Sequence, residues 1–254
     1  MNLIGSLVIA FAMYSAIPVP QIAWNEARLK YVMVFFPLVG AVIGGILAGL
    51  CLLAKRLALP VPAFACLAAA VPVLLTGGIH MDGFLDTVDA RSSHLERERK
   101  LEILKDPHVG AFAIIGGGVY LLLSVAGYCG MESREAVVYA GALVFSRAFS
   151  GWALITWKKA RKDGLAQTFS EGAGGPLLKG ALLVWMAAAG LWIAVWGNVL
   201  TAVLCGLTAV FVCIWYYRVA MREFGGITGD LAGYFLQLCE LGLLWAVVIG
   251  GGMY

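Results

Sequence analysis

Charge is scarce in this chain. Only 13% of its 254 residues are Asp, Glu, Lys or Arg, whereas soluble domains carry about 25%. Hydrophobic residues make up 61% of the sequence, and the mean hydropathy is +0.89. This shortage excludes an ordinary soluble globule and predicts a protein that crosses a membrane several times.

Other missing features exclude further classes of protein. The six cysteines lie in or beside apolar segments and none forms a Cys-x-x-Cys pair, so we expect reduced, buried, structural thiols. The net charge of +3 is small, and no basic tail or stripe of arginine and aromatic residues is present, which argues against nucleic-acid binding. The apolar N-terminus lacks a basic region and a convincing cleavage site, which favours a first membrane helix over a signal peptide.

Hydrophobic runs recur eight times, with lengths close to the roughly 20 residues that a helix needs to cross a bilayer. The first and third runs are short and suit tilted, re-entrant or interfacial helices. We therefore predict an all-α, polytopic integral membrane helical bundle with 6–8 transmembrane helices, forming a single membrane domain over residues 1–254. The runs lie near residues 3–17, 31–54, 61–75, 109–128, 136–157, 177–196, 199–217 and 231–250.

Basic residues are concentrated in alternate loops between these runs. The first, third, fifth and seventh loops hold 14 of the 18 Lys and Arg residues, the other loops hold 3, and Arg147 lies inside a run. Because Lys and Arg favour cytoplasmic loops, we expect the odd loops to face the cytoplasm. The 14 are Arg28, Lys30, Arg91, Arg97, Arg99, Lys100, Lys105, Lys158, Lys159, Arg161, Lys162, Lys179, Arg218 and Arg222; the 3 are Lys55, Arg56 and Arg134.

The third loop, residues 76–108, contains the most acidic stretch of the chain, Thr76-Gly-Gly-Ile-His-Met-Asp-Gly-Phe-Leu-Asp-Thr-Val-Asp89. Asp82, Asp86 and Asp89 fall within roughly a 60° arc if this stretch is helical. In a soluble protein, carboxylates on one helix face usually just form a solvated face. Beside membrane segments such groups are costly and generally functional, and ligand sets made only of oxygen favour Mg²⁺ or Mn²⁺. We therefore predict that Asp82, Asp86 and Asp89 bind Mg²⁺.

Further polar residues complete a set suited to phosphoryl transfer, in which carboxylates hold a divalent ion and cations hold phosphate oxygens. The flexible pairs Gly77-Gly78 and Gly225-Gly226 permit close approach of the backbone to a phosphate, although this signal is weak. The predicted catalytic residues are Asp82, Asp86, Asp89, Lys105, Asp106 and Arg147. The predicted substrate-binding residues are Gly77, Gly78, His80, Arg91, Arg161, Lys162 and Asp230.

Several of these residues have a second interpretation. Arg147 pairs with a substrate phosphate, with an aspartate or with Glu240, or it snorkels to the membrane surface. His80 is a ligand, a base or a structural histidine, and Asp230 caps the last helix or binds metal. The basic cluster at residues 158–162 binds phosphate or only anchors the loop to the cytoplasmic face.

Three segments resemble the cobalamin synthase (adenosylcobinamide-GDP ribazoletransferase) family. They are Gly77-Gly-Ile-His-Met-Asp-Gly-Phe-Leu-Asp-Thr-Val-Asp89, Lys100-Leu-Glu-Ile-Leu-Lys-Asp-Pro-His-Val-Gly-Ala-Phe112 and Gly225-Gly-Ile-Thr-Gly-Asp230. Ile17-Pro-Val-Pro20 and Phe36-Pro-Leu-Val-Gly40 agree, so the resemblance covers nearly the whole chain. The spacing of the aspartates is the specific part of it.

The resemblance implies an enzyme of a prokaryotic cytoplasmic (inner) membrane whose active site faces the cytoplasm. It would join α-ribazole, or its 5′-phosphate, to adenosylcobinamide-GDP in vitamin B12 synthesis, giving adenosylcobalamin, or its 5′-phosphate, and GMP, with Mg²⁺ required. Its partners would be the corrinoid nucleotide, ribazole and the lipid bilayer, and a homo-oligomer is compatible with the sequence. Pro107-His108 stands where Ser-Arg is common in the family, so Arg91 or Lys105 would replace an arginine that contacts phosphate.

Two other functions use similar residues. A phosphotransferase acting on CDP-alcohols would also need clustered aspartates and Mg²⁺, and release of CMP instead of GMP would identify it. An ion-coupled transporter would use Asp82, Arg147 and Glu240 as a relay, but most acidic residues lie in loops on one side and no repeated halves are apparent.

Overall fold

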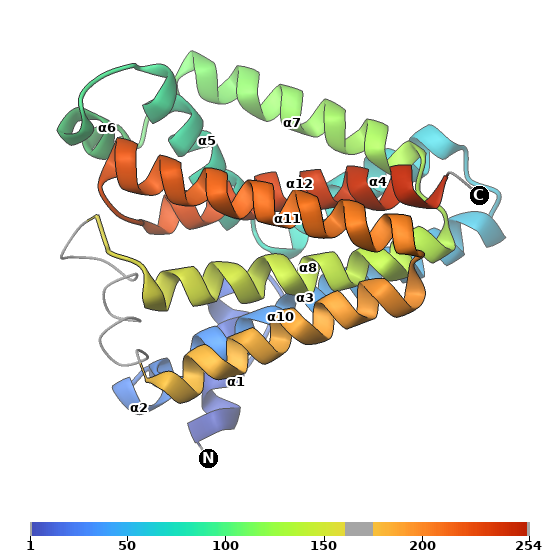
Figure 1. Ribbon diagram of the computed structural model, residues 1–254, viewed down its shortest axis with the longest axis horizontal. Helices are drawn as coiled ribbons and strands as arrows, with labels where there is room; N and C mark the ends of the chain where they lie inside the picture. The colour runs from blue at the N-terminus through green and yellow to red at the C-terminus, as the bar shows by residue number, and fades with distance from the viewer. Residues whose placement is uncertain (1, 161–174, 253–254) are drawn as a thin grey trace.

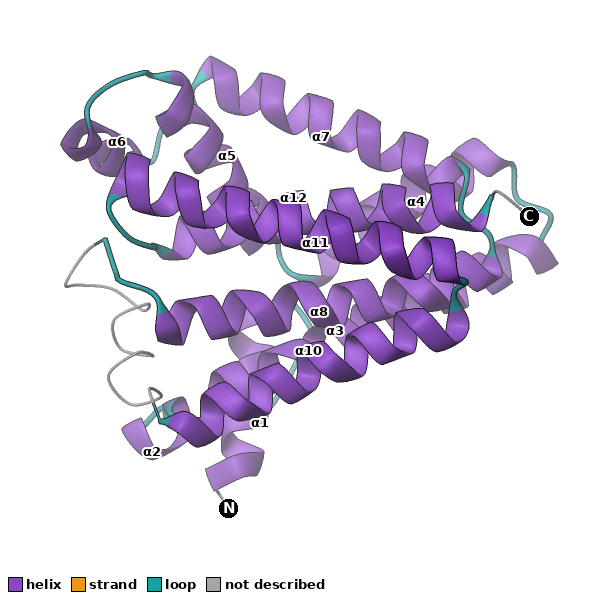
Figure 2. Ribbon diagram, in the orientation of Figure 1, coloured by secondary structure: helices purple, strands orange, loops and turns teal. Residues whose placement is uncertain are grey.

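The computed structural model describes residues 2–160 and 175–252 (Figure 1). Within these ranges every regular element is a helix (Figure 2). An isolated bridge joins Lys159 to Ile227. The helices are α1 (Asn2–Tyr14), α2 (Glu26–Leu29), α3 (Val32–Arg56), α4 (Val61–Leu75), α5 (Ile79–Ser92), α6 (Arg97–Ile103), α7 (Ala111–Cys129), α8 (Ser133–Thr156), α10 (Pro176–Trp196), α11 (Val199–Val219), the π-helical turn η1 (Ala220–Phe224) and α12 (Gly229–Gly251). The predicted all-α class is confirmed.

Six of the described helices are long and apolar enough to cross a membrane: α3, α7, α8, α10, α11 continued by η1, and α12. They run side by side along the long axis of the molecule (Figure 1). The pair formed by α4 and α5 would add a seventh crossing, but it is bent by 94°. Helix α1, with 13 residues, is shorter. The chain is thus a multi-pass membrane protein, and its six or seven spans fall within the predicted range.

Helices α11 and α12 begin at residues whose side chains cap them. The side chains of Asn198 and Thr228 accept hydrogen bonds from backbone N–H groups in the first turns of α11 and α12. Pro176 opens α10, where a missing N–H group costs nothing. These three helices therefore begin at polar or proline residues.

The bend between α4 and α5 depends on two glycines. Gly77 and Gly78 have φ angles of 62° and 78°, in the left-handed region that side chains disfavour. After the bend, α5 crosses the first turns of α7 and α12. Gly116 of α7 lies directly against Val88, and Gly233 of α12 lies against the backbone of His80. Close packing through glycines is typical of helices in membranes.

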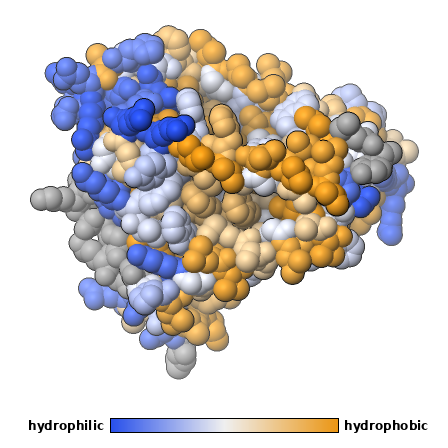
Figure 3. Space-filling view, viewed as in Figure 1, coloured by the Kyte–Doolittle hydropathy of each residue, from blue (hydrophilic) through white to orange (hydrophobic). Residues whose placement is uncertain are grey.

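One end of the bundle is polar. It contains α5, α6 and η1, and Figure 3 shows hydrophilic residues gathered there, while hydrophobic residues cover most of the remaining surface in this view. At this end α3, α7, α10 and α12 begin and α8 and α11 finish (Figure 1). Of the 14 basic residues of the odd-numbered loops, those within the described ranges lie at this end, in loops or at helix ends. Lys55, Arg56 and Arg134 lie at the opposite end.

All six cysteines are free thiols, as predicted. The prediction that all are buried is wrong for Cys66 and Cys129, which are exposed on α4 and α7. The lipid-facing side of a membrane helix is as apolar as its packed side, so apolar surroundings in the sequence do not separate the two positions.

Candidate active site

The three aspartates of the acidic stretch lie on one helix at the polar end of the bundle. Asp82 is exposed, and Asp86 and Asp89 are half-buried. Helix α5 has too little apolar character to be counted as a span by itself, and we place it outside the membrane-spanning segments. The prediction that the three carboxylates lie along one helix is confirmed.

Asp230 joins this group from α12. Thr228 is the N-cap of that helix, so the alternative in which Asp230 is the cap is wrong. The hydroxyl of Thr228 donates to Asp230 Oδ2 over 3.3 Å. Across the helix interface, Gly83 of α5 lies directly against the backbone of Asp230. The absence of a side chain at Gly83 is what brings Asp230 beside the aspartates of α5.

The four carboxylates influence one another electrostatically. Partial burial, followed by the charges of Asp82, Asp230 and Asp89, raises the pKa of Asp86 to about 6. Like charges that approach this closely resist ionisation together, and a bound cation would relieve the repulsion. The four groups supply only oxygen ligands, which suits a hard divalent ion.

Within residues 2–160 and 175–252, no three acidic, histidine or cysteine side chains already converge as a metal cage. Asp82, Asp86, Asp89 and Asp230 would therefore hold an ion only after their carboxylates rotate. Magnesium retains several water ligands in most protein sites, so one or two direct carboxylates suffice. The four aspartates could supply the one or two direct carboxylates that Mg²⁺ needs.

The carboxylate of Asp89 occupies the space beside Gly110. A Cβ atom at Gly110 would collide with both carboxylate oxygens. Gly110 immediately precedes α7, so Asp89 lies next to the first turn of that helix. This contact explains why the segment Lys100–Phe112 carries glycine at this position, and it connects two of the three segments that resemble the family.

His80 points into the bundle. Its side chain is 5% exposed, its ring stacks on Tyr14 with centroids 6.0 Å apart, and its ring lies 5.6 Å from that of Phe36. Burial, and secondarily the charge of Arg147, lowers the pKa of His80, so the imidazole is neutral at pH 7. His80, Asp82 and Asp230 line one cavity of about 200 Å³.

Arg147 lies in the core on α8, with 1% of its surface exposed. Its guanidinium forms an ion pair with Glu240 of α12 at 2.6 Å and donates to the carbonyl of Leu143 over 3.1 Å. Ser146 donates to the same Glu240 oxygen over 3.1 Å. Of the alternatives, pairing with Glu240 is confirmed and snorkelling is wrong. These bonds go to Glu240 and Leu143 rather than to an aspartate of α5, and the catalytic role of Arg147 stays a prediction.

Arg91 is engaged with other protein groups. Its guanidinium donates twice to Glu223 Oε1, over 3.1 and 2.9 Å, and once to the hydroxyl of Tyr234, over 2.7 Å. Lys100 also pairs with Glu223, at 3.0 Å. Arg91 therefore ties α5 to η1 and α12. Sequence reasoning missed Glu223 and Tyr234, although an acidic residue beside a glycine pair was a usable signal.

The remaining predicted residues lie around this group. Lys105 and Asp106 are exposed between α6 and α7, and hydrogen bonds from His108 lower the pKa of Asp106. Arg161 and Lys162 lie outside the described residues. The neighbouring Lys158 is exposed, and its carbonyl accepts from the N–H of Ile227 over 2.9 Å. This bridge holds the fifth loop against the seventh.

Replacing Gly83 with alanine should disrupt the site. The new Cβ would lie 2.8 Å from the Cα and carbonyl oxygen of Asp230, so α5 and α12 must separate. We expect a loss of about 1–3 kcal/mol of unfolding free energy together with most of the activity. Thermal unfolding in detergent and a turnover assay would measure this. Gly118→Ala is the matched control, because nothing lies within 4 Å of its added Cβ; equal effects of the two substitutions would contradict the packing argument.

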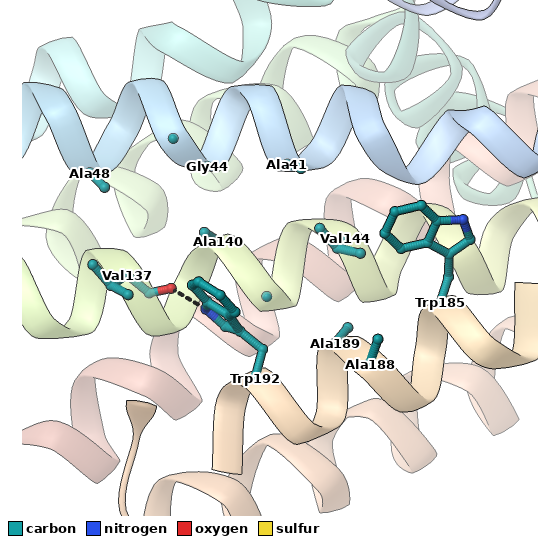
Figure 4. Close-up of a pocket in the computed structure, with 12 residues that line it drawn as sticks. Ala41, Gly44, Ala48, Val137, Ala140, Val144, Trp185, Ala188, Ala189 and Trp192 are labelled. Carbon is teal, nitrogen blue, oxygen red and sulfur yellow. Dashed lines mark hydrogen bonds between the residues drawn. The ribbon is translucent and has the colours of Figure 1, made fainter. Parts of the chain in front are cut away.

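A larger cavity than the one beside His80 lies elsewhere. It is an apolar groove of about 370 Å³ between α3, α8 and α10, lined by small residues and by Trp185 and Trp192. In Figure 4 the indole N–H of Trp192 donates to the carbonyl of Val137, over 2.8 Å. The groove is lined by no ionisable side chain, so it offers none of the chemistry found beside α5.

Comparisons with known proteins cover the whole length of the chain. The family model described as cobalamin-5-phosphate synthase matches residues 6–248. A protein of Lachnoclostridium phytofermentans named adenosylcobinamide-GDP ribazoletransferase is 44% identical over 257 residues, covering 100% of this chain and 97% of the relative. Proteins with the same name in Clostridium perfringens and Azorhizobium caulinodans are 32% and 35% identical, covering 90% and 94% of this chain and 91% and 94% of their own lengths. No solved structure matches.

Proposed function

This chain belongs to the cobalamin-5-phosphate synthase family of transferases, and on that premise we propose that it joins α-ribazole, or its 5′-phosphate, to adenosylcobinamide-GDP. The products are adenosylcobalamin, or its 5′-phosphate, and GMP. The observation that supports this most directly is the gathering of Asp82, Asp86, Asp89 and Asp230 at the polar end of a membrane bundle. Phosphoryl transfer needs such positioning and charge control more than covalent catalysis.

The reaction displaces one phosphate ester oxygen by another. A ribose hydroxyl of ribazole attacks the phosphorus next to cobinamide, and the bond from that phosphorus to the bridging oxygen breaks. GMP leaves with the bridging oxygen, and the hydroxyl proton passes to a carboxylate, for which Asp86 and Asp89 are the candidates. The attacking hydroxyl is not the 5′ one, because that oxygen already carries phosphate in the phosphorylated substrate.

Mg²⁺ bound by the aspartates would neutralise charge on the diphosphate. Asp82, Asp86, Asp89 and Asp230 are the residues that would hold this ion at the polar end of the bundle. In this proposal the exposed cations Lys105 and Lys158 contact the departing GMP. Arg161 and Lys162 remain predicted phosphate contacts. Arg91, which is held by Glu223, and Lys105 both remain candidates for the role of the replaced arginine in this proposal.

The polar end faces the cytoplasm in this proposal. The described basic residues of the odd-numbered loops gather there, and the positive-inside rule places such loops on the cytoplasmic side. Nucleotide substrates and Mg²⁺ would then reach the aspartates directly. The membrane would be the cytoplasmic membrane of a prokaryote.

Product analysis tests the function. Membranes containing the chain are supplied with adenosylcobinamide-GDP, α-ribazole and Mg²⁺, with and without EDTA. We expect GMP and a complete corrinoid in equal amounts, and no product with EDTA. The absence of GMP from well-inserted protein would overturn the proposal, and release of CMP from a CDP-alcohol would favour the lipid phosphotransferase.

A further inference from the structure

The cavity beside His80 differs from the aspartate cluster in character. Its volume is about 200 Å³, and five helices contribute to its wall: α1, α3, α5, α8 and α12. Apolar side chains form most of the wall, and the carboxylates of Asp82 and Asp230 lie at one side. The lining residues that carry the argument are Tyr14, Phe36, His80, Ser150, Leu154 and Leu236.

Aromatic rings dominate one part of this wall. Tyr14 and Phe36 lie with their centroids 4.3 Å apart, and His80 packs against both. The buried Nε2 atom of His80 has no hydrogen-bond partner among the described residues. A buried polar atom without a partner is costly, and in a ligand site the ligand commonly supplies the missing bond. The wall thus offers flat apolar contact, and the His80 ring that contributes to it carries one unsatisfied polar atom.

The proposed reaction has three bulky groups that need binding sites: a corrinoid, a guanosine and the benzimidazole base of ribazole. The corrinoid is larger than the cavity, since pockets for drug-sized ligands already span about 300–1,000 Å³. Guanine presents several donors and acceptors along its edges, whereas most of the wall is apolar and would leave many of them without partners. Benzimidazole is flat, bicyclic and apolar apart from its ring nitrogens, and it matches this wall.

We propose that the base of ribazole binds in the cavity lined by Tyr14, Phe36 and His80, with its ribose beside Asp82 and Asp230. This inference rests on the proposed function and specifies which substrate the cavity receives. It places the attacking hydroxyl next to the carboxylates, while the corrinoid and guanosine remain outside. It also explains why His80 is buried inside the bundle although it belongs to the acidic stretch.

Steady-state kinetics of Tyr14→Leu and Tyr14→Phe test the proposal. We expect Tyr14→Leu to raise the KM for ribazole about tenfold by removing a stacking surface. The KM for adenosylcobinamide-GDP should stay unchanged, and Tyr14→Phe should behave like the wild type. Phe211→Leu, which removes an aromatic ring exposed on α11, is the matched control and should change neither KM. An unchanged ribazole KM in Tyr14→Leu, or a rise only in the nucleotide KM, would overturn the assignment.

A second measurement uses the unaltered protein. Ribazole analogues with progressively larger bases are assayed, and we expect the KM to rise steeply once the base exceeds the bicyclic size. Equal KM values for small and large bases would place the base outside the cavity. Failure of this inference can be distinguished from failure of the proposed function. If the proposed function is wrong, the wild type releases no GMP with any ribazole.

Discussion

Asp82→Asn should lower turnover by roughly 100- to 1,000-fold, the range found when one preorganised electrostatic group is removed from an active site. The amide keeps the shape of the side chain but removes its negative charge. Because Asp82 is exposed at the polar end, the substitution should leave folding and membrane insertion intact. Activity per inserted protein, with insertion checked by protease protection, would measure the effect.

Glu98→Gln is the matched control for this variant. Glu98 lies on α6 at the same end of the molecule, and its side chain is exposed. We expect its activity to stay within twofold of the wild type. Full activity in Asp82→Asn, or equal losses in both variants, would remove the carboxylate cluster from the mechanism.

Glu240→Leu should be the most destabilising single substitution considered for this protein. Removing one partner of a buried ion pair typically costs about 3–5 kcal/mol, because the other charge remains uncompensated. Arg147 is 1% exposed, so its guanidinium would remain buried without a counter-charge, and the unfolding free energy should fall below that of the wild type. Unfolding in detergent, followed by temperature or denaturant, would show the difference.

The double variant Arg147→Leu, Glu240→Leu separates stability from catalysis. Both buried charges are gone, so we expect most of the lost stability to return. Turnover of this folded variant then reports on Arg147 itself, and recovered turnover would limit the pair to joining α8 to α12 inside the bundle. A folded but inactive double variant would instead support the catalytic role predicted for Arg147. A wild-type stability for Glu240→Leu alone would contradict the structural account of the pair.

The sequence alone was sufficient to predict the all-α membrane class and the shared helix face of the aspartates on α5. In a bilayer, the backbone N–H and C=O groups of a long apolar run must form their hydrogen bonds within the same segment, so the run forms a helix. The spacing of Asp82, Asp86 and Asp89 fixes their shared face as soon as the segment is helical. Both conclusions depend on local geometry, which a sequence expresses directly.

Contacts between distant segments were harder to predict. The approach of Asp230 to the cluster depends on Gly83 packing against the backbone of α12, and a glycine alone does not name its partner. Arg91 looked available for phosphate, but its partners Glu223 and Tyr234 lie more than a hundred residues away. The prediction that Glu240 pairs with Arg147 is confirmed. Opposite charges buried in the same membrane bundle are each other's most available partners.

Metal binding by purified protein tests the central claim most directly. Mn²⁺, whose unpaired electrons allow bound and free ion to be distinguished by electron paramagnetic resonance, would be titrated into the wild type, Asp82→Asn, Asp230→Asn and Glu98→Gln. The account predicts a site that is present in the wild type and in Glu98→Gln, that Mg²⁺ displaces, and that is weakened at least tenfold by either aspartate substitution. Equal Mn²⁺ binding in all four proteins would contradict a site shared between α5 and α12.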